Sequence, residues 1–416
     1  MLADVPIVFV LIGITAYTVL SGADFGAGLW MLIPGGGQAD AATTRDHTRH
    51  SIGPVWEANH VWLIFVLTVA WTCYPGAFGS IVSTLAIPLL IAAIGIIFRG
   101  TTYALRGVLE RGEGRGVSLV EKLFALSSVL TPFALATVVG AIATGRVPVG
   151  NARGNIITSW LNPVSILAGV LAVAFSGYLA AVYLAADARR LGEPVLTRDF
   201  RGRALLAGVV AGALALAGLL VVRFTAAALW HGLTTGAGLA LVVVSGVAGV
   251  LTLVLVWWSA FGPARASAAL AVAAVIAGWA AAQEPQLLPG LTVRAAAAGR
   301  ATLIATIIGV AVGAAVLVPA LALLYTLVLR GRLDTTAPSA PSVASASSVP
   351  SVPLVARDGR IAVGRPAWAF AAVTLVAGAG LVVFAGPSWA LGIGALLLVA
   401  CAVTVFALTA VPDEKT

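Results

Sequence analysis

Five polar side chains stand within or at the edge of long apolar runs, where they could carry protons. Asp24 lies in SGADFGAG, Glu57, Asn59 and His60 lie in VWEANHVWL, and Arg99 lies in IIFRGTT. A charged side chain at bilayer depth costs on the order of 3 kcal/mol, so such residues usually face a bundle interior or water and serve a function. Two acids, a histidine and an arginine in the first hundred residues would suit proton transfer from an aqueous surface.

The local sequence allows two readings of these residues. Glu57 and His60 are three apart, so on a helix they share one face and could form a hydrogen-bonded pair. Small residues around Asp24, spaced four apart, would let another backbone approach closely. Alternatively, Arg99 only neutralises Glu57 or extends to the interface, Asp24 caps a neighbouring backbone, and His60 is a satisfied polar residue. The residues alone leave both readings open.

The composition indicates what kind of protein must position these groups. Of 416 residues, 60% are hydrophobic and only 10% are charged, and the mean hydropathy is +1.04. These values are typical of a polytopic helical membrane protein and exclude a soluble fold. The net charge of +8 comes from arginines in short connections, which argues against nucleic acid as a partner.

A membrane-spanning helix needs about 20 mostly apolar residues, and this length divides the chain into segments. The sequence predicts an all-α membrane protein with nine core helices near 6–33, 54–74, 78–105, 119–145, 160–186, 203–222, 236–260, 266–282 and 299–329. Two further helices are expected near 367–385 and 388–410. The first run follows Asp4 rather than basic residues, so we expect a retained helix and not a cleaved signal peptide.

Three regions follow from this segmentation. Residues 1–332 form the nine-helix core, residues 333–365 form a cytoplasmic linker rich in Pro, Ser and Ala, and residues 366–416 form a two-helix extension. The linker has almost no bulky apolar side chain to bury, which is typical of a disordered connection.

The distribution of Lys and Arg predicts the orientation. Eighteen of the 24 basic residues fall on one side of the predicted spans, five fall on the other, and Arg99 lies within a span. Because cytoplasmic loops collect Lys and Arg, we expect the amino terminus outside and the carboxyl terminus in the cytoplasm. With about 1.5 Å of rise per residue, Asp24, Glu57 and Arg99 then fall in the cytoplasmic half and predict a hydrated vestibule that opens inward.

Several other kinds of site are not indicated. A haem with two axial ligands needs facing His or Met side chains, and the chain has only four His and two Met, with His47 and His50 in the first inner loop. There is no phosphate-binding loop, dinucleotide fingerprint or metal-ligand spacing. Cys73 and Cys401 lie in apolar segments far apart, so we expect buried thiols rather than a disulfide or a metal site.

Five stretches resemble subunit II of the cytochrome bd-type quinol oxidases. The most specific are GADFGAGLW (22–30) and SIGPVWEANHVWLI (51–64), which are similar to stretches of that family's first two helices. FRGTTYALR (98–106) is similar to the inner end of that family's third helix, LNPVSILAGV (161–170) to the start of its fifth, and LVPALALLY (317–325) to its last core helix. The resemblance covers roughly residues 1–330 in order.

This resemblance implies two four-helix bundles and one peripheral helix, in a heterodimer with a haem-bearing subunit I. That complex oxidises quinol, reduces dioxygen to water and takes protons from the cytoplasm, in the bacterial cytoplasmic membrane. No cofactor would be ligated by this chain, and haems b and d would lie in subunit I. The family's proton-delivering acid on the second helix corresponds to Glu57, and Asp24 and Arg99 occupy its other matched polar positions.

The sequence departs from the family pattern at three places. Position 57 holds Glu where Asp is expected, position 60 holds His where Glu or Gln is frequent, and residues from about 333 to 416 have no counterpart. The extra helices could pack at the periphery or bind a small accessory membrane subunit. Whether a quinone or lipid also binds this chain stays open.

Two alternatives remain beside the oxidase subunit. Intramembrane acids and Gly-rich helices also occur in proton-coupled secondary transporters, although this chain has no pair of broken helices in matching halves. A purely structural subunit would use the polar cluster only to hold helices together. The colour of a haem-containing complex would separate the first alternative from an oxidase.

Overall fold

The computed structural model describes residues 2–33, 40–52, 56–104 and 115–329, with single helical positions at 370, 373, 374, 377, 393, 397 and 400. The chain divides into two compact units, Met1–Thr335 and Thr336–Thr416. The predicted linker and the two predicted C-terminal helices fall outside the described residues, apart from those single positions. Their boundaries therefore stay predictions.

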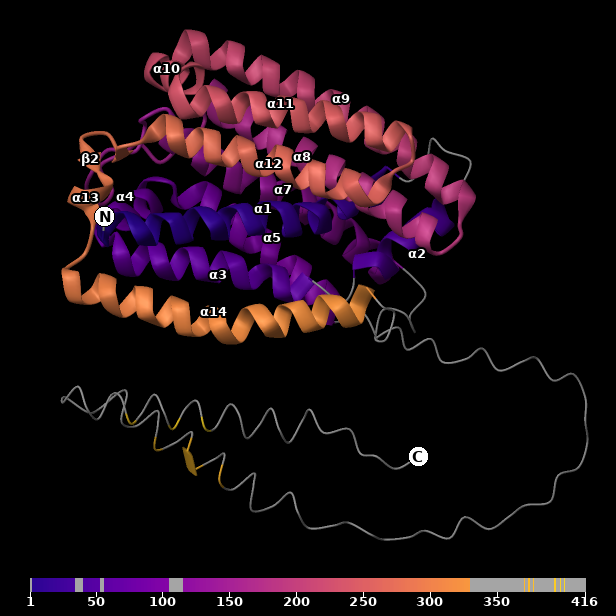
Figure 1. Ribbon diagram of the computed structural model, residues 1–416, viewed down its shortest axis with the longest axis horizontal. Coiled ribbons are helices and arrows are strands. Elements are labelled where there is room, and N and C mark those ends of the chain that lie inside the picture. Colours follow the sequence, from indigo (N-terminus) through magenta and orange to yellow (C-terminus); the bar gives the residue numbers. More distant parts are fainter. Residues whose placement is uncertain are drawn as a thin grey trace, which may run out of the picture. The chain divides into compact units, whose positions relative to one another are not determined.

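The first unit is built almost entirely from helices (Figure 1). In chain order, its elements are η1 Leu2–Asp4, α1 Val5–Leu32, α2 Ala41–Ile52, α3 Trp56–Cys73, α4 Pro75–Thr84, α5 Ala86–Ala104, α7 Arg115–Ala143, α8 Pro163–Arg190, α9 Pro194–Thr225, α10 Ala227–Thr234, α11 Gly236–Trp257, α12 Phe261–Gln283, β1 Gln286–Leu288, β2 Leu291–Thr292, α13 Val293–Ala296 and α14 Arg300–Leu329.

The prediction of an all-α membrane protein is confirmed. Seven helices in the described part of the chain are long and apolar enough to cross a membrane, or eight if a bent pair is one span, and Asn59–Cys73 is a shorter apolar helix. The outward faces of α9, α11 and α14 carry large apolar side chains such as Leu216, Val247 and Val316. Lipid is the solvent that suits such faces. The count of nine helices plus two is not established by these spans.

The helix expected at 78–105 is broken. Residues Pro75–Thr84 and Ala86–Thr102 meet at an angle of 84°, and Leu85 between them is fully buried. The break follows from Pro88, which has no N–H to donate to the carbonyl of Thr84 and whose ring would clash with it in a continuous helix. The apolar run continues across this point, so hydropathy alone does not locate the bend.

The connection between α1 and α3 holds a helix where the sequence indicated a loop. Asp40 begins α2 by accepting a hydrogen bond from the Thr43 backbone N–H at Oδ1 (2.6 Å), and this bond lowers the pKa of the Asp40 carboxyl. The His47 ring is buried, with Nε2 3.2 Å from the Leu184 carbonyl oxygen. α2 thus packs against α8 through an otherwise polar segment.

The helices pack in two groups. In the first, α1 contacts α3 and α7, and α5 contacts α7; in the second, α8 contacts α9 and α12, and α11 contacts α9 and α12. α1 and α7 join the groups through α8, while α14 lies beside α3 (Figure 1). A core of Trp30, Tyr178, Phe200 and Phe261 fills the joint between α1, α8, α9 and α12.

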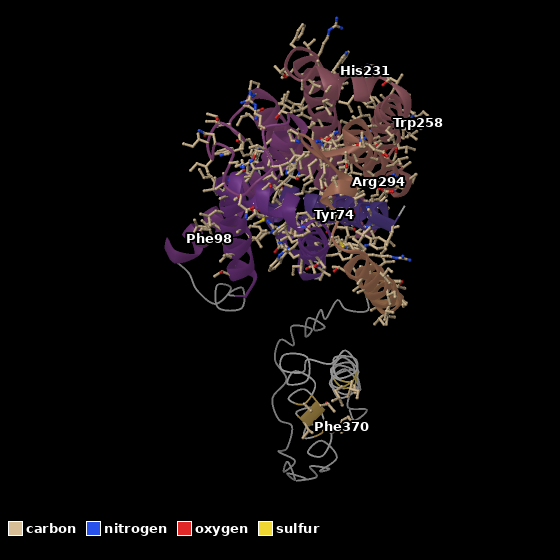
Figure 2. All side chains as sticks on the ribbon, turned by 90° about the vertical axis from the view of Figure 1, so that its left-hand side faces the viewer. Tyr74, Phe98, His231, Trp258, Arg294 and Phe370 are labelled. Atoms are coloured by element: carbon tan, nitrogen blue, oxygen red, sulfur yellow. The ribbon has the colours of Figure 1, made fainter. Side chains whose placement is uncertain are left out.

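A second core lies near the amino-terminal end of α1. It includes Tyr74, Leu85 and Leu288, all almost fully buried, and Leu288 belongs to the short antiparallel hairpin of β1 and β2. The Tyr74 hydroxyl donates to the Ala3 carbonyl (2.6 Å). Figure 2 shows Tyr74 within the helices, whereas Trp258 and Phe98 stand at the periphery.

Candidate functional site

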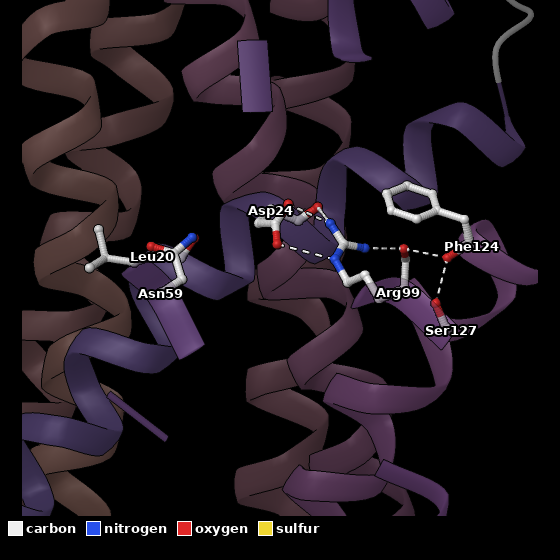
Figure 3. Close-up of polar contacts among 7 residues, drawn as sticks. Leu20, Asp24, Asn59, Arg99, Phe124 and Ser127 are labelled. Atoms are coloured by element: carbon white, nitrogen blue, oxygen red, sulfur yellow. Dashed lines mark hydrogen bonds and ion pairs between the residues drawn. The ribbon is translucent and has the colours of Figure 1, made fainter. Parts of the chain in front are cut away.

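A buried ion pair joins α1 to α5. The Arg99 side chain is 0% exposed and that of Asp24 is 2% exposed. Arg99 Nε donates to Asp24 Oδ2 (3.1 Å) and Nη2 donates to Oδ1, so the guanidinium binds the carboxylate in a bidentate manner (Figure 3). Nη2 also donates to the Asp24 carbonyl (2.8 Å). Sequence reasoning picked out both residues but not their pairing across 75 positions.

α7 completes the surroundings of the guanidinium. Arg99 Nη1 donates to Ser128 Oγ (2.5 Å), and the Ser128 hydroxyl donates onward to the Phe124 carbonyl (2.7 Å). The Phe25 and Phe124 rings lie 4.9 and 4.4 Å from the guanidinium carbon, close enough for cation–π attraction. Sequence analysis missed Ser128, although two adjacent serines, 127 and 128, in an apolar helix could have identified it.

Glycines make this contact geometrically feasible. A Cβ atom at Gly28 would stand 2.0 Å from Ser128 Oγ, and one at Gly26 would stand 1.8 Å from the Ser176 carbonyl oxygen. Because no real Cβ approaches so closely, α1 can meet α7 and α8 here only without side chains. The small residues noted around Asp24 therefore bring three helices together.

Asn59 and His60 face the same stretch of α1 from α3. Asn59 Nδ2 donates a long hydrogen bond to the Leu20 carbonyl (3.4 Å). The His60 ring is edge-on to Tyr17 and Phe25, with ring centroids 6.0 and 6.3 Å away. Since Phe25 also covers Arg99, His60 and the ion pair share an aromatic neighbour.

Glu57 lies in the first turn of α3, but its side chain is outside the described part of the structure. The expected Glu57–His60 hydrogen bond is therefore untested and stays a prediction. The interpretation in which Arg99 extends to the interface does not hold within this chain, because Arg99 is fully buried. Four of the five predicted residues, all but Glu57, are thus placed around one segment of α1.

The described residues contain no group of three or more His, Cys, Asp or Glu side chains suited to a metal ion. The site can hold a fixed positive charge, a fixed negative charge and a polar path, but its described side chains do not resemble a metal centre. The described site is therefore a buried, neutralised pair of charges with polar neighbours.

A sequence model described as cytochrome bd terminal oxidase subunit II matches residues 2–328. The chain belongs to this family. The matched segment covers nearly the whole of the first compact unit, so the family assignment applies to the helices that carry the polar site.

Two individual proteins are similar to this family member. Cytochrome bd ubiquinol oxidase subunit 2 of Bacillus subtilis (strain 168) is 26% identical over 172 residues, which is 41% of this chain and 48% of that protein. The match thus spans about half the length of that relative. The structure of bd oxidase from Geobacillus thermodenitrificans aligns with a TM-score of 0.61 and 23% identity, covering 79% of this chain and 98% of that one. This likeness shows a shared fold.

Proposed function

We propose that this subunit II scaffolds a haem-bearing subunit I in a quinol:dioxygen oxidoreductase and helps to take up protons from the cytoplasm for reduction of dioxygen to water. The family match along residues 2–328 carries the proposal. Under it, the chain resides in the bacterial cytoplasmic membrane with its amino terminus outside. The excess of Arg and Lys on one side of the spans supports that orientation.

The polar residues divide into two roles. Asp24 and Arg99 neutralise one another and also bind Ser128, so they are positioning residues that lock α1, α5 and α7 together. Glu57, at the start of α3, is the proton acceptor, and His60 lies one helical turn further along the same face. A carboxylate near the membrane surface can exchange protons with water, whereas a sealed ion pair cannot do so readily.

We assign haems b and d to subunit I because of the ligand chemistry available in this chain. An axial pair needs His or Met side chains that face one another. His47 Nε2 lies against the Leu184 carbonyl, and the His60 ring is packed between Tyr17 and Phe25. These histidines suit helix packing and proton contact rather than an axial pair.

The experiment is a Glu57→Gln substitution in the whole complex. We expect slower oxygen reduction with unchanged haem content, because the amide keeps the shape of the side chain but cannot accept a proton. The matched control is Glu193→Gln, an exposed acid at the start of α9, which should leave turnover unchanged. Oxygen consumption per haem measures both.

Three results would overturn the proposal or part of it. Unchanged turnover in a fully assembled Glu57→Gln complex removes the proton role, and loss of assembly assigns Glu57 a structural one. A purified complex without haem absorption would favour the transporter alternative over an oxidase.

A further inference from the structure

Three buried polar atoms at the α1–α3 interface lack hydrogen bonds. They are the Tyr17 hydroxyl, Ser21 Oγ and Asn59 Oδ1, none of which finds a partner in the described portion of the chain. The residues are 8%, 0% and 2% exposed. Buried polar groups in folded proteins are almost always hydrogen-bonded to protein or to ordered water. Three neighbouring polar atoms without a protein partner therefore need a common explanation.

The three atoms belong to one stretch of the interface. Tyr17 and Ser21 are one turn apart on the same face of α1, and their hydroxyls are neighbours without reaching normal hydrogen-bond geometry. Asn59 reaches this stretch from α3, since its Nδ2 donates to the Leu20 carbonyl. His60, the next residue, lies edge-on to the Tyr17 ring.

We propose that this polar seam, defined as Tyr17, Ser21 and Asn59, binds internal water. Two hydroxyls and an amide oxygen supply both donors and acceptors, which is the partner set that a buried water needs. The seam is buried by helices of this chain, so its missing partners are small molecules that enter between α1 and α3. Water is the molecule that fits this chemistry.

The seam also has a direction. Tyr17 precedes Asp24 by seven residues on α1, a rise of about 10 Å. The Tyr17 ring is edge-on to Phe25 (centroids 6.4 Å apart), and Phe25 covers the Arg99 guanidinium. α3 runs antiparallel beside it, from Glu57 through Asn59 and His60. Water in the seam would therefore extend the polar region from the Glu57 end of α3 toward the middle of α1.

A role for this water in proton transfer rests on the proposed function. If Glu57 takes up protons, water held by Tyr17, Ser21 and Asn59 relays them deeper, because each water both accepts and donates a proton along hydrogen bonds. Tyr17, Ser21 and Asn59 are then positioning residues for the relay. None of them needs to be a permanent proton carrier.

The first test is a high-resolution density map of the whole oxidase complex. We expect water density within hydrogen-bond distance of Tyr17, Ser21 and Asn59 in the unaltered protein, and loss of part of it in Ser21→Ala. An empty seam, or a protein or lipid atom in the place of water, overturns the inference. This outcome does not depend on whether Glu57 moves protons.

The second test measures proton uptake during a single turnover in Tyr17→Phe and Ser21→Ala complexes. We expect uptake to slow severalfold at unchanged haem content and unchanged KM for quinol, with an altered solvent isotope effect. Tyr178→Phe is the matched control, because it removes another buried hydroxyl, from a side chain whose ring packs near Gly208 of α9. Its uptake should equal that of the unaltered complex.

The outcomes separate the seam from the proposed function. Slow uptake in Glu57→Gln with normal uptake in both seam variants overturns the relay and leaves the proposed function standing. If the map shows water in the seam but the Glu57→Gln complex turns over normally, the hydrated seam stands and the proton role of Glu57 is removed. If the Tyr17→Phe complex fails to assemble, proton uptake in Ser21→Ala tests the relay, since this substitution deletes a single oxygen atom and disturbs the packing least.

Discussion

At the scale of single residues, the buried pair of Arg99 and Asp24 is the central feature of the site. Burying two charges is costly, and the cost is offset only when geometry is good and the remaining polar atoms are satisfied. Here the guanidinium has the carboxylate, the Asp24 carbonyl and Ser128 as acceptors, and two aromatic rings against its faces. The arrangement meets both conditions.

Removing one member of this pair should therefore destabilise the protein strongly. Asp24→Asn leaves Arg99 buried without a counter-charge, and we expect a loss of about 3–5 kcal/mol in the free energy of unfolding. Thermal unfolding of the purified complex, followed by its haem absorption, measures the effect.

The control for Asp24→Asn is Asp4→Asn. Asp4 pairs with Arg294 at 3.3 Å, but these side chains are 41% and 74% exposed, so solvent screens the interaction and the unfolding midpoint should hardly change. Equal midpoints for the two variants would contradict the stabilising role assigned to the buried pair.

At the scale of helices, glycine decides how closely α1 approaches its neighbours. Gly26 faces the backbone of α8 at Ser176, and Gly28 faces Ser128 of α7. These contacts bring Asp24 within reach of Arg99, since α1 packs against α7, which in turn packs against α5. The separation of the helices and the geometry of the ion pair are therefore coupled.

A methyl group at Gly26 should separate α1 from α8. We expect Gly26→Ala to cost about 1–3 kcal/mol or more, because the clash is with backbone and cannot be relieved by a side-chain rotation. Gly212→Ala is the control, since nothing lies within 4 Å of a Cβ atom at that position in α9. The yield of assembled, haem-containing complex and its unfolding temperature measure both variants, and a Gly26→Ala complex as stable as the control would refute the close approach.

At the scale of the whole chain, the family match and the first compact unit coincide. The match ends at residue 328 and the unit ends at Thr335. Helices that bury their polar groups among themselves need no support from a separate unit. The second unit, Thr336–Thr416, therefore stands outside the part that defines the family.

We expect truncation after Thr335 to leave the oxidase assembled and active. The truncated complex should keep its haem spectrum and its oxygen consumption per haem, because the described site lies wholly in the first unit. Loss of haem or of the partner subunit would instead place the second unit in the assembly interface. A subunit list of each purified complex distinguishes these results.

The sequence by itself determined the class of fold and the candidate residues. Each long apolar helix in the described part of the chain overlaps a range predicted from hydropathy, because apolar length is set by the thickness of the bilayer. Asp24 and Arg99 could be singled out because charge inside an apolar run is costly wherever the helix ends up. Short helices such as α2 and α10 escaped this reasoning, since neither is long enough to span.

Only the tertiary structure decided which polar group meets which. Nothing local indicates that Arg99 binds Asp24 rather than Glu57, or that Ser128 completes the contact, because pairing depends on helix rotation and separation across tens of residues. The bend at Leu85 was also visible only in the structure, since hydropathy measures how apolar a segment is and not its direction. The unpaired atoms of Tyr17, Ser21 and Asn59 likewise emerge only when α1 and α3 are packed together.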